Sequence, residues 1–175
     1  IWVSTYLGVS VWQDTTDYLT TINRSNEPGL PDNNVTSFAF PRNSEDIWIG
    51  TLNGLGKWDS EKGSVVDQSS LLGDGRLSIL EVDHQNNLWV GTVESGITVI
   101  KADVSTVVYT SSSGAGLPSN AITSIKTDYR GQVWVAIYNS GVIYFDGENF
   151  QSLDSYIANN SITPTNPTNL EADST

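Results

Sequence analysis

The residues best suited to bind a ligand lie in loops next to four nearly identical pentads. The pentads are IWVST at 1–5, IWIGT at 47–51, LWVGT at 88–92 and VWVAI at 133–137. The candidate ligand-binding residues are Tyr6, Asn53, Glu94, Tyr138 and Asn139 after the pentads, and Asp32, Arg76 and Asn120 ahead of them. Tyrosine rings can stack on a sugar, and amide and charged groups can hydrogen-bond its hydroxyls, so this set suits carbohydrate recognition.

The sequence holds no recognisable catalytic or metal-binding set. It has no cysteine and a single histidine, His84. Carboxylates are plentiful, but no motif fixes a pair of them, as a glycosidase would require. The runs DHQNN and DGENF lack the ligand spacing of a calcium-binding loop. We therefore predict no catalytic residue, no metal site and no cofactor.

The spacing of the pentads predicts a repeated structural unit. Their tryptophans, Trp2, Trp48, Trp89 and Trp134, are separated by 46, 41 and 45 residues. A glycine follows each tryptophan after 6, 6, 7 and 7 residues and opens a short apolar stretch. Three of the tryptophans are also preceded by apolar stretches, VTSFAF at 35–40, LSILEV at 77–82 and ITSIKT at 122–127. These stretches are short, rich in β-branched and aromatic residues, and bounded by turn-forming residues, as β-strands are.

Four short strands every 41–46 residues are typical of the blades of a β-propeller. We therefore predict an all-β fold, a β-propeller of four-stranded antiparallel blades, with about four blades present in residues 1–156. The expected parts are a partial blade at 1–22 and full blades at 33–70, 75–112 and 120–154. Residues 157–175 are expected to start a further inner strand or to form a flexible tail. A β-sandwich is the alternative fold, although a sandwich does not need a repeat.

The segments around the tryptophans resemble the two-component regulator propeller repeat. Residues 116–150 read GLPSNAITSIKTDYRGQVWVAIYNSGVIYFDGENF, and residues 29–59 are similar. That repeat typically reads GLP, Asn, an apolar strand, Asp and Gly, and then Trp-Val-Gly-Thr; the third copy here lacks GLP, and the fourth has VWVAI. The resemblance implies a periplasmic sensor propeller of a bacterial hybrid histidine kinase, and many such sensors respond to polysaccharide breakdown products. We therefore expect a non-catalytic periplasmic or extracellular sensor that binds an oligosaccharide or another small ligand.

Two other functions stay open at this point. One is a propeller enzyme, either a polysaccharide or streptogramin-type lyase or a glycoside hydrolase, and the other is a secreted protein-interaction scaffold. Lyases of the virginiamycin B type resemble this repeat, and a catalytic histidine is expected at their channel face. His84 is expected in a turn between first and second strands, on the opposite face, which argues against a lyase.

The charge of the chain limits its partners. The net charge is −12, and the 8 basic residues are scattered along the sequence, whereas nucleic acid binding needs clustered basic charge. We therefore expect no nucleic acid partner. No apolar run approaches the roughly 18 residues of a membrane span, so we also expect no membrane contact within this segment. Propellers of this family usually have more than four blades. We therefore expect a fragment of a larger ring, a ring closed by dimerisation or a small four-bladed ring, and an open fragment would self-associate or pack on other blades of the same protein.

Overall fold

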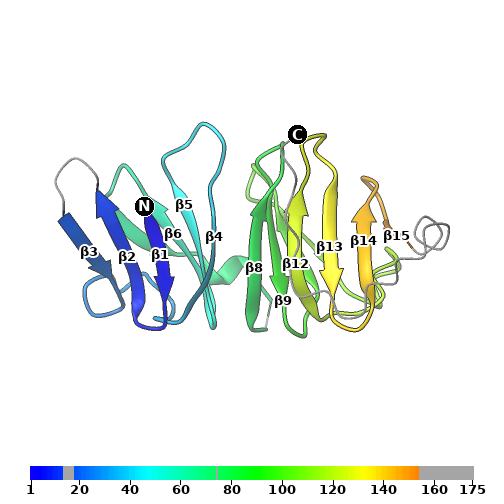
Figure 1. Ribbon diagram of the computed structural model, residues 1–175, viewed down its shortest axis with the longest axis horizontal. Helices are drawn as coiled ribbons and strands as arrows, with labels where there is room; N and C mark the ends of the chain where they lie inside the picture. The colour runs from blue at the N-terminus through cyan, green and yellow to red at the C-terminus, as the bar shows by residue number, and fades with distance from the viewer. Residues whose placement is uncertain (14–17, 74, 154–175) are drawn as a thin grey trace.

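The computed structural model describes residues 1–13, 18–73 and 75–153, which form four antiparallel sheets side by side (Figure 1). Blade 1 contains β1 (Trp2–Thr5), β2 (Gly8–Gln13) and β3 (Tyr18–Ile22), and blade 2 contains β4 (Val35–Ala39), β5 (Ile47–Thr51), β6 (Gly54–Asp59) and β7 (Ser64–Asp67). Blade 3 contains β8 (Leu77–Val82), β9 (Leu88–Thr92), β10 (Ile97–Ile100) and β11 (Thr106–Tyr109), and blade 4 contains β12 (Ile122–Thr127), β13 (Val133–Ile137), β14 (Gly141–Phe145) and β15 (Phe150–Ser152). The predicted all-β propeller is confirmed. The strand or tail expected at 157–175 lies outside the described residues.

Blades 2, 3 and 4 are four-stranded meanders in which consecutive strands pair. Their first strands, β4, β8 and β12, lie next to one another and form the inner edge of the blades (Figure 1). Each of these inner strands has a bulge at its start, where the pairing shifts between Val35 and Ser37, Leu77 and Ile79, or Ile122 and Ser124. A bulge bends a strand and increases its twist, so the same device shapes all three inner strands. A single turn of 3₁₀-helix, η1 (Ser69–Leu71), lies in the crossover from blade 2 to blade 3.

The hydrophobic core lies between the blades. Three buried clusters fill the three interfaces, and their fully buried members include Val9 and Ile49, Leu55 and Leu80, and Ile97 and Val135. The pentad tryptophan of one blade packs on the third strand of the next. The ring centroids of Trp2 and Trp58 are 5.6 Å apart, and those of Trp89 and Phe145 are 5.2 Å apart. Such edge-to-face pairs add to the free energy gained by burying apolar area, so the tryptophans are structural residues.

The glycine of the pentad sets how closely two blades approach. A Cβ atom added to Gly50 would lie 2.8 Å from a methyl carbon of Leu77, which belongs to the inner strand of the next blade. A Cβ atom added to Gly91 would lie 2.7 Å from Ile122 in the same way. A side chain at either position would therefore push the second strand of one blade away from the inner strand of the next. Ala136 takes this place in blade 4.

Candidate functional site

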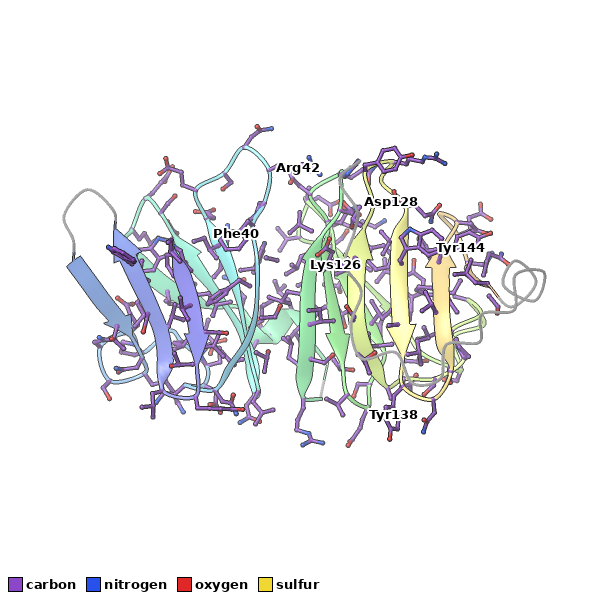
Figure 2. All side chains as sticks on the ribbon, in the orientation of Figure 1. Phe40, Arg42, Lys126, Asp128, Tyr138 and Tyr144 are labelled. Carbon is purple, nitrogen blue, oxygen red and sulfur yellow. The ribbon has the colours of Figure 1, made fainter. Side chains whose placement is uncertain are left out.

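The second-to-third-strand turns and the crossovers between blades lie together at one end of the sheets, and we call this end the loop face. The same backbone hydrogen bond joins turn and crossover in three blades. The donors and acceptors are Leu52 N–H to Asn34 C=O at 2.8 Å, Val93 N–H to Arg76 C=O at 2.9 Å, and Tyr138 N–H to Ala121 C=O at 2.9 Å. All eight residues of the predicted site lie in these turns and crossovers. Figure 2 shows Tyr138 at this end of blade 4 and Asp128 at the other end.

The structure brings Asp32 and Asn53 together in blade 2. The side-chain Nδ2 of Asn53 donates to Oδ2 of Asp32 at 2.5 Å, and the backbone N–H of Asn34 donates to Oδ1 at 2.8 Å. The hydrogen bond from Asn34 lowers the pKa of Asp32, burial opposes this effect, and the hydrogen bond from Asn53 and the positive charge of Arg24 lower the pKa further. Asp32 is therefore a carboxylate at neutral pH, with the amide of Asn53 held beside it.

Arg76 and Glu94 form the corresponding pair in blade 3. A guanidinium nitrogen of Arg76 lies 3.3 Å from Oε1 of Glu94, and the two side chains are 56% and 76% exposed. An ion pair this exposed contributes little to stability, because water and salt screen it. Both side chains can therefore turn toward a ligand at small cost.

Asn120 holds the crossover into blade 4. Its Oδ1 accepts a hydrogen bond from the backbone N–H of Ser111 at 2.7 Å, as Oδ1 of Asn33 does from Arg24 at 2.8 Å. The carbonyl of Asn120 also accepts from the N–H of Gly96 at 3.0 Å. These bonds engage Asn120 with the backbone, so its first role is to shape the loop face.

The two tyrosines of the predicted set are exposed at the tips of their turns. Tyr6 is 83% exposed in the β1–β2 turn, and Tyr138 is 54% exposed in the β13–β14 turn. Asn139, beside Tyr138, has a φ of 56° and closes that turn. The two tyrosines belong to the first and last blades, at opposite ends of the molecule (Figure 1). The structure therefore offers two polar pairs in the middle blades and a separate aromatic ring at either end.

The opposite end of the sheets, which we call the turn face, carries a repeated aspartate. The carboxylate of Asp83 accepts from the backbone N–H groups of Gln85 at 2.8 Å and Asn87 at 2.9 Å, and from the indole Nε1 of Trp89 at 2.9 Å. Asp83 is also buried, and it stands six residues before the tryptophan. The aspartate therefore ties the tight turn to the pentad tryptophan.

Asp128 repeats this arrangement in blade 4. It accepts from Arg130 N–H at 2.9 Å, Gln132 N–H at 3.0 Å and the indole Nε1 of Trp134 at 3.0 Å. Burial favours the protonated acid, but the hydrogen bond from Trp134 and those from the two backbone N–H groups outweigh it and lower the pKa of Asp128. Both aspartates are anchors of the scaffold.

A groove of about 870 Å³ opens on the turn face between blades 3 and 4, and the sequence did not predict it. Trp89, Tyr109 and Phe145 line it and contact one another, with the rings of Trp89 and Tyr109 stacked at 6.4 Å. The spacing of Asp83 and Asp128 ahead of the tryptophans was visible in the sequence. The volume depends on how far the outer strands of two blades separate, which no local pattern records.

His84 lies in the turn between β8 and β9, against Gly131 of the next turn. It belongs to the turn face and is far from the predicted site residues. Among residues 1–13, 18–73 and 75–153, no three histidine, aspartate or glutamate side chains are grouped so that they could hold a metal ion. The same part of the chain contains no helix that is long and apolar enough to cross a membrane.

Comparisons with known proteins identify the repeat. Residues 116–139 match the family described as two component regulator propeller, so the repeat recognised from the sequence is confirmed. A stretch of 95 residues is 34% identical to histidine kinase P4 of Formosa agariphila, and it covers 49% of this chain and 7% of the kinase. The chain therefore spans a small part of that relative.

Solved structures share the fold. One is described as the extracellular domain of a hybrid two component system, BT4673, of B. thetaiotaomicron; it has a TM-score of 0.74 and 21% identity, over 99% of this chain and 23% of that chain. Another is virginiamycin B lyase from Staphylococcus aureus, solved as an inactive histidine-to-alanine variant with quinupristin. Its TM-score is 0.64 at 14% identity, over 85% of this chain and 48% of the lyase. At these identities the similarity shows the β-propeller fold alone.

Proposed function

We propose that this chain is part of the extracytoplasmic sensor propeller of a bacterial two-component signalling protein, and that its loop face binds an oligosaccharide. The observation that carries the proposal is the two-component regulator repeat at 116–139, together with the 34% identity to a histidine kinase over 95 residues. The likeness to a domain described as extracellular supports a periplasmic or extracellular location.

The chemistry of the loop face supports a sugar as the ligand. Asp32 with Asn53, and Arg76 with Glu94, present donors and acceptors side by side, as vicinal hydroxyl groups require. Tyr138 adds an exposed ring with a flat apolar face and a polar tip.

The arrangement supports binding without catalysis. The carboxylates Asp32 and Glu94 belong to different blades, and each is engaged with its own partner, so no carboxylate pair flanks a common point. A lyase is the second candidate, because virginiamycin B lyase has the same fold and its inactive variant lacks a histidine. His84 lies on the turn face, away from the proposed site, which favours the sensor. Turnover of a polysaccharide or of a streptogramin by the purified chain would favour the lyase instead.

The test is calorimetric titration of the chain with a panel of glucan, mannan, xylan, galactan and uronate hexaoses. Tyr138→Ala should weaken binding of the recognised sugar about three- to tenfold, because contact with an aromatic face contributes on the order of 0.5–1.5 kcal/mol. Tyr129→Ala is the matched control, since Tyr129 is 61% exposed and Tyr138 54% exposed, at opposite ends of β13 in the same blade. The control should leave affinity unchanged.

Two results would contradict the proposal. If no hexaose produces heat of binding or raises the melting temperature, the proposed oligosaccharide ligand is wrong. If the Tyr138 and Tyr129 substitutions weaken the affinity for the sugar equally, the loop face is not the binding site.

A further inference from the structure

The groove between blades 3 and 4 combines an aromatic wall with a cationic rim. Trp89, Tyr109 and Phe145 form the aromatic wall, and the exposed side chains of Lys101 and Arg130 form the cationic rim. The volume of about 870 Å³ is within the range of pockets that hold small organic ligands, about 300–1,000 Å³. We propose that this groove binds a small aromatic carboxylate, with its ring on the wall and its carboxylate at the rim. This site is separate from the oligosaccharide site proposed on the loop face.

The aromatic wall is held in place by the core. The rings of Tyr109 and Phe145 meet edge to face at 5.4 Å, and each of them also contacts Trp89 and Phe150. Trp89 is 3% exposed, whereas Tyr109 and Phe145 are only partly buried and line the groove. A ligand ring can therefore pack against these two rings, offset or edge to face, while the core keeps its arrangement.

The cationic rim has hydrogen-bond donors that the scaffold leaves free. In the part of the chain that the structure describes, Lys101 forms no ion pair. The Nε atom of Arg130 donates to the hydroxyl of Tyr129 at 2.6 Å, and the guanidinium carbon lies 5.1 Å from the centroid of that ring. These contacts hold the guanidinium group beside the groove. Its terminal nitrogens can then donate to both oxygens of a ligand carboxylate.

The three aspartates that line the groove are already engaged with the scaffold. Asp83 and Asp128 each accept from the indole of a pentad tryptophan and from two backbone N–H groups. Asp146 accepts from two backbone N–H groups and, at 2.8 Å, from Nε2 of Gln151. A carboxylate has about four lone-pair sites, so these bonds use most of its capacity. The charged groups that stay free to bind a ligand are therefore donors, which favours an acid over an amine.

The apolar side chains of the groove favour an aromatic acid over an acidic sugar. Val99, Val107 and Val133 line the groove beside the three rings and offer no hydrogen bond. Hydroxyl groups around a sugar ring would be left unpaired against these side chains, at a cost in free energy. An aromatic ring has no such groups, and its burial against apolar side chains is favourable.

The test is calorimetric titration of the whole chain, residues 1–175, with phenylpropionate, phenylpropanol and phenylpropylamine. The three molecules share one ring and differ in charge. The acid should bind at least about tenfold more tightly than the alcohol, because only the acid forms charge-assisted hydrogen bonds with the rim. The amine should bind most weakly. Added salt should weaken binding of the acid and leave binding of the alcohol unchanged.

Substitutions locate the ligand in the groove. Lys101→Gln and Arg130→Gln should each weaken binding of the acid about two- to fivefold and leave binding of the alcohol unchanged. Lys62→Gln is the matched control, since Lys62 is 65% exposed in the turn after β6, outside the groove, and it should have no effect. Phe145→Leu should weaken binding of the acid and the alcohol alike, because it removes an aromatic ring from the wall. Melting curves must show that each variant is folded.

Four results would overturn the proposal. They are no heat of binding with phenylpropionate at about 10 mM, an amine that binds as tightly as the acid, equal effects at Lys62 and at the rim, and a uronate trisaccharide that binds the groove more tightly than phenylpropionate. Tyr138→Ala should leave binding of phenylpropionate unchanged. The outcome for the groove is therefore distinct from the outcome for the loop face.

Discussion

Val104, in the turn between β10 and β11, is strained, and we predict that replacing it stabilises the protein. Its φ is 67°, in the left-handed region, and its side chain is 58% exposed. A side chain with a Cβ atom costs about 1–2 kcal/mol in that region, and a β-branched one is a genuine outlier. The corresponding turn of blade 2 ends instead in Gly63, with a φ of 63°.

The expected gain for Val104→Asn is the difference between two terms. Val104→Asn removes most of the left-handed strain, because asparagine tolerates that region. It gives up the apolar contact of a side chain that is already more than half exposed, at a cost of about 0.5 kcal/mol. The net prediction is stabilisation by about 1 kcal/mol. Val104→Gly should gain less, because the extra freedom of glycine in the unfolded chain costs about 0.5–1 kcal/mol.

Urea denaturation followed by tryptophan fluorescence measures these differences, provided that the m value is unchanged. A gain of 1 kcal/mol should also raise the melting temperature by about 2–4 °C in a domain of this size. Val108→Asn is the matched control, since Val108 is 52% exposed but lies in a regular strand, and it should be neutral or destabilising. Gly63→Val gives the reverse test, because no atom lies within 4 Å of an added Cβ and only the backbone conformation opposes it.

Three results would contradict strain at Val104. If Val104→Asn is no more stable than the parent, or if Gly63→Val costs nothing, then the left-handed conformation carries no strain in these turns. If Val108→Asn stabilises as much as Val104→Asn, the gain comes from surface polarity instead.

Three further predictions follow from the packing and the charges. Gly91→Ala should destabilise by about 1–3 kcal/mol in urea, because β9 must move away from Ile122 on the inner strand of the next blade. Asp128→Asn should cost about 2 kcal/mol in urea, because the neutral amide cannot accept all the hydrogen bonds of the carboxylate, one of them from Trp134. The pKa of Asp46 is lowered to about 2, chiefly by the hydrogen bond from Lys57. A lowered pKa stabilises the protein above the unfolded pKa, so this stability should be lost between about pH 4 and pH 2, and Asp46→Asn should flatten that part of the pH profile.

The strands and their order could be predicted because they depend on local patterns. Each pentad, its following glycine and the apolar stretch before it occur at a fixed spacing, and the period of the repeat predicts blades. The face of each turn could also be predicted, since consecutive antiparallel strands place alternate turns at opposite ends. That rule places Tyr138 and His84 at different ends of the sheets.

The contacts within the candidate site could not be predicted in the same way. Asp32 and Asn53 are 21 residues apart, and their hydrogen bond depends on how the crossover lies over the turn. An asparagine after GLP can hydrogen-bond the local backbone, but the sequence does not show that the partner of Asn120 is the N–H of Ser111. The strain at Val104 was equally hidden, because a valine between Asp103 and Ser105 gives no sign of a left-handed φ.

Blade 2 fixes its pentad tryptophan by a different contact from the one used in blades 3 and 4. Blades 3 and 4 hold their tryptophans with an aspartate six residues earlier, whereas blade 2 has Arg42 at that place. Here Asp46 pairs with Lys57 at 2.7 Å, and the ammonium group of Lys57 lies 5.4 Å from the ring centroid of Trp48. A cation over the ring face replaces an acceptor at the ring edge, and both fix the indole. A departure from the repeat can therefore be offset by a contact elsewhere in the blade, and it does not by itself indicate a functional residue.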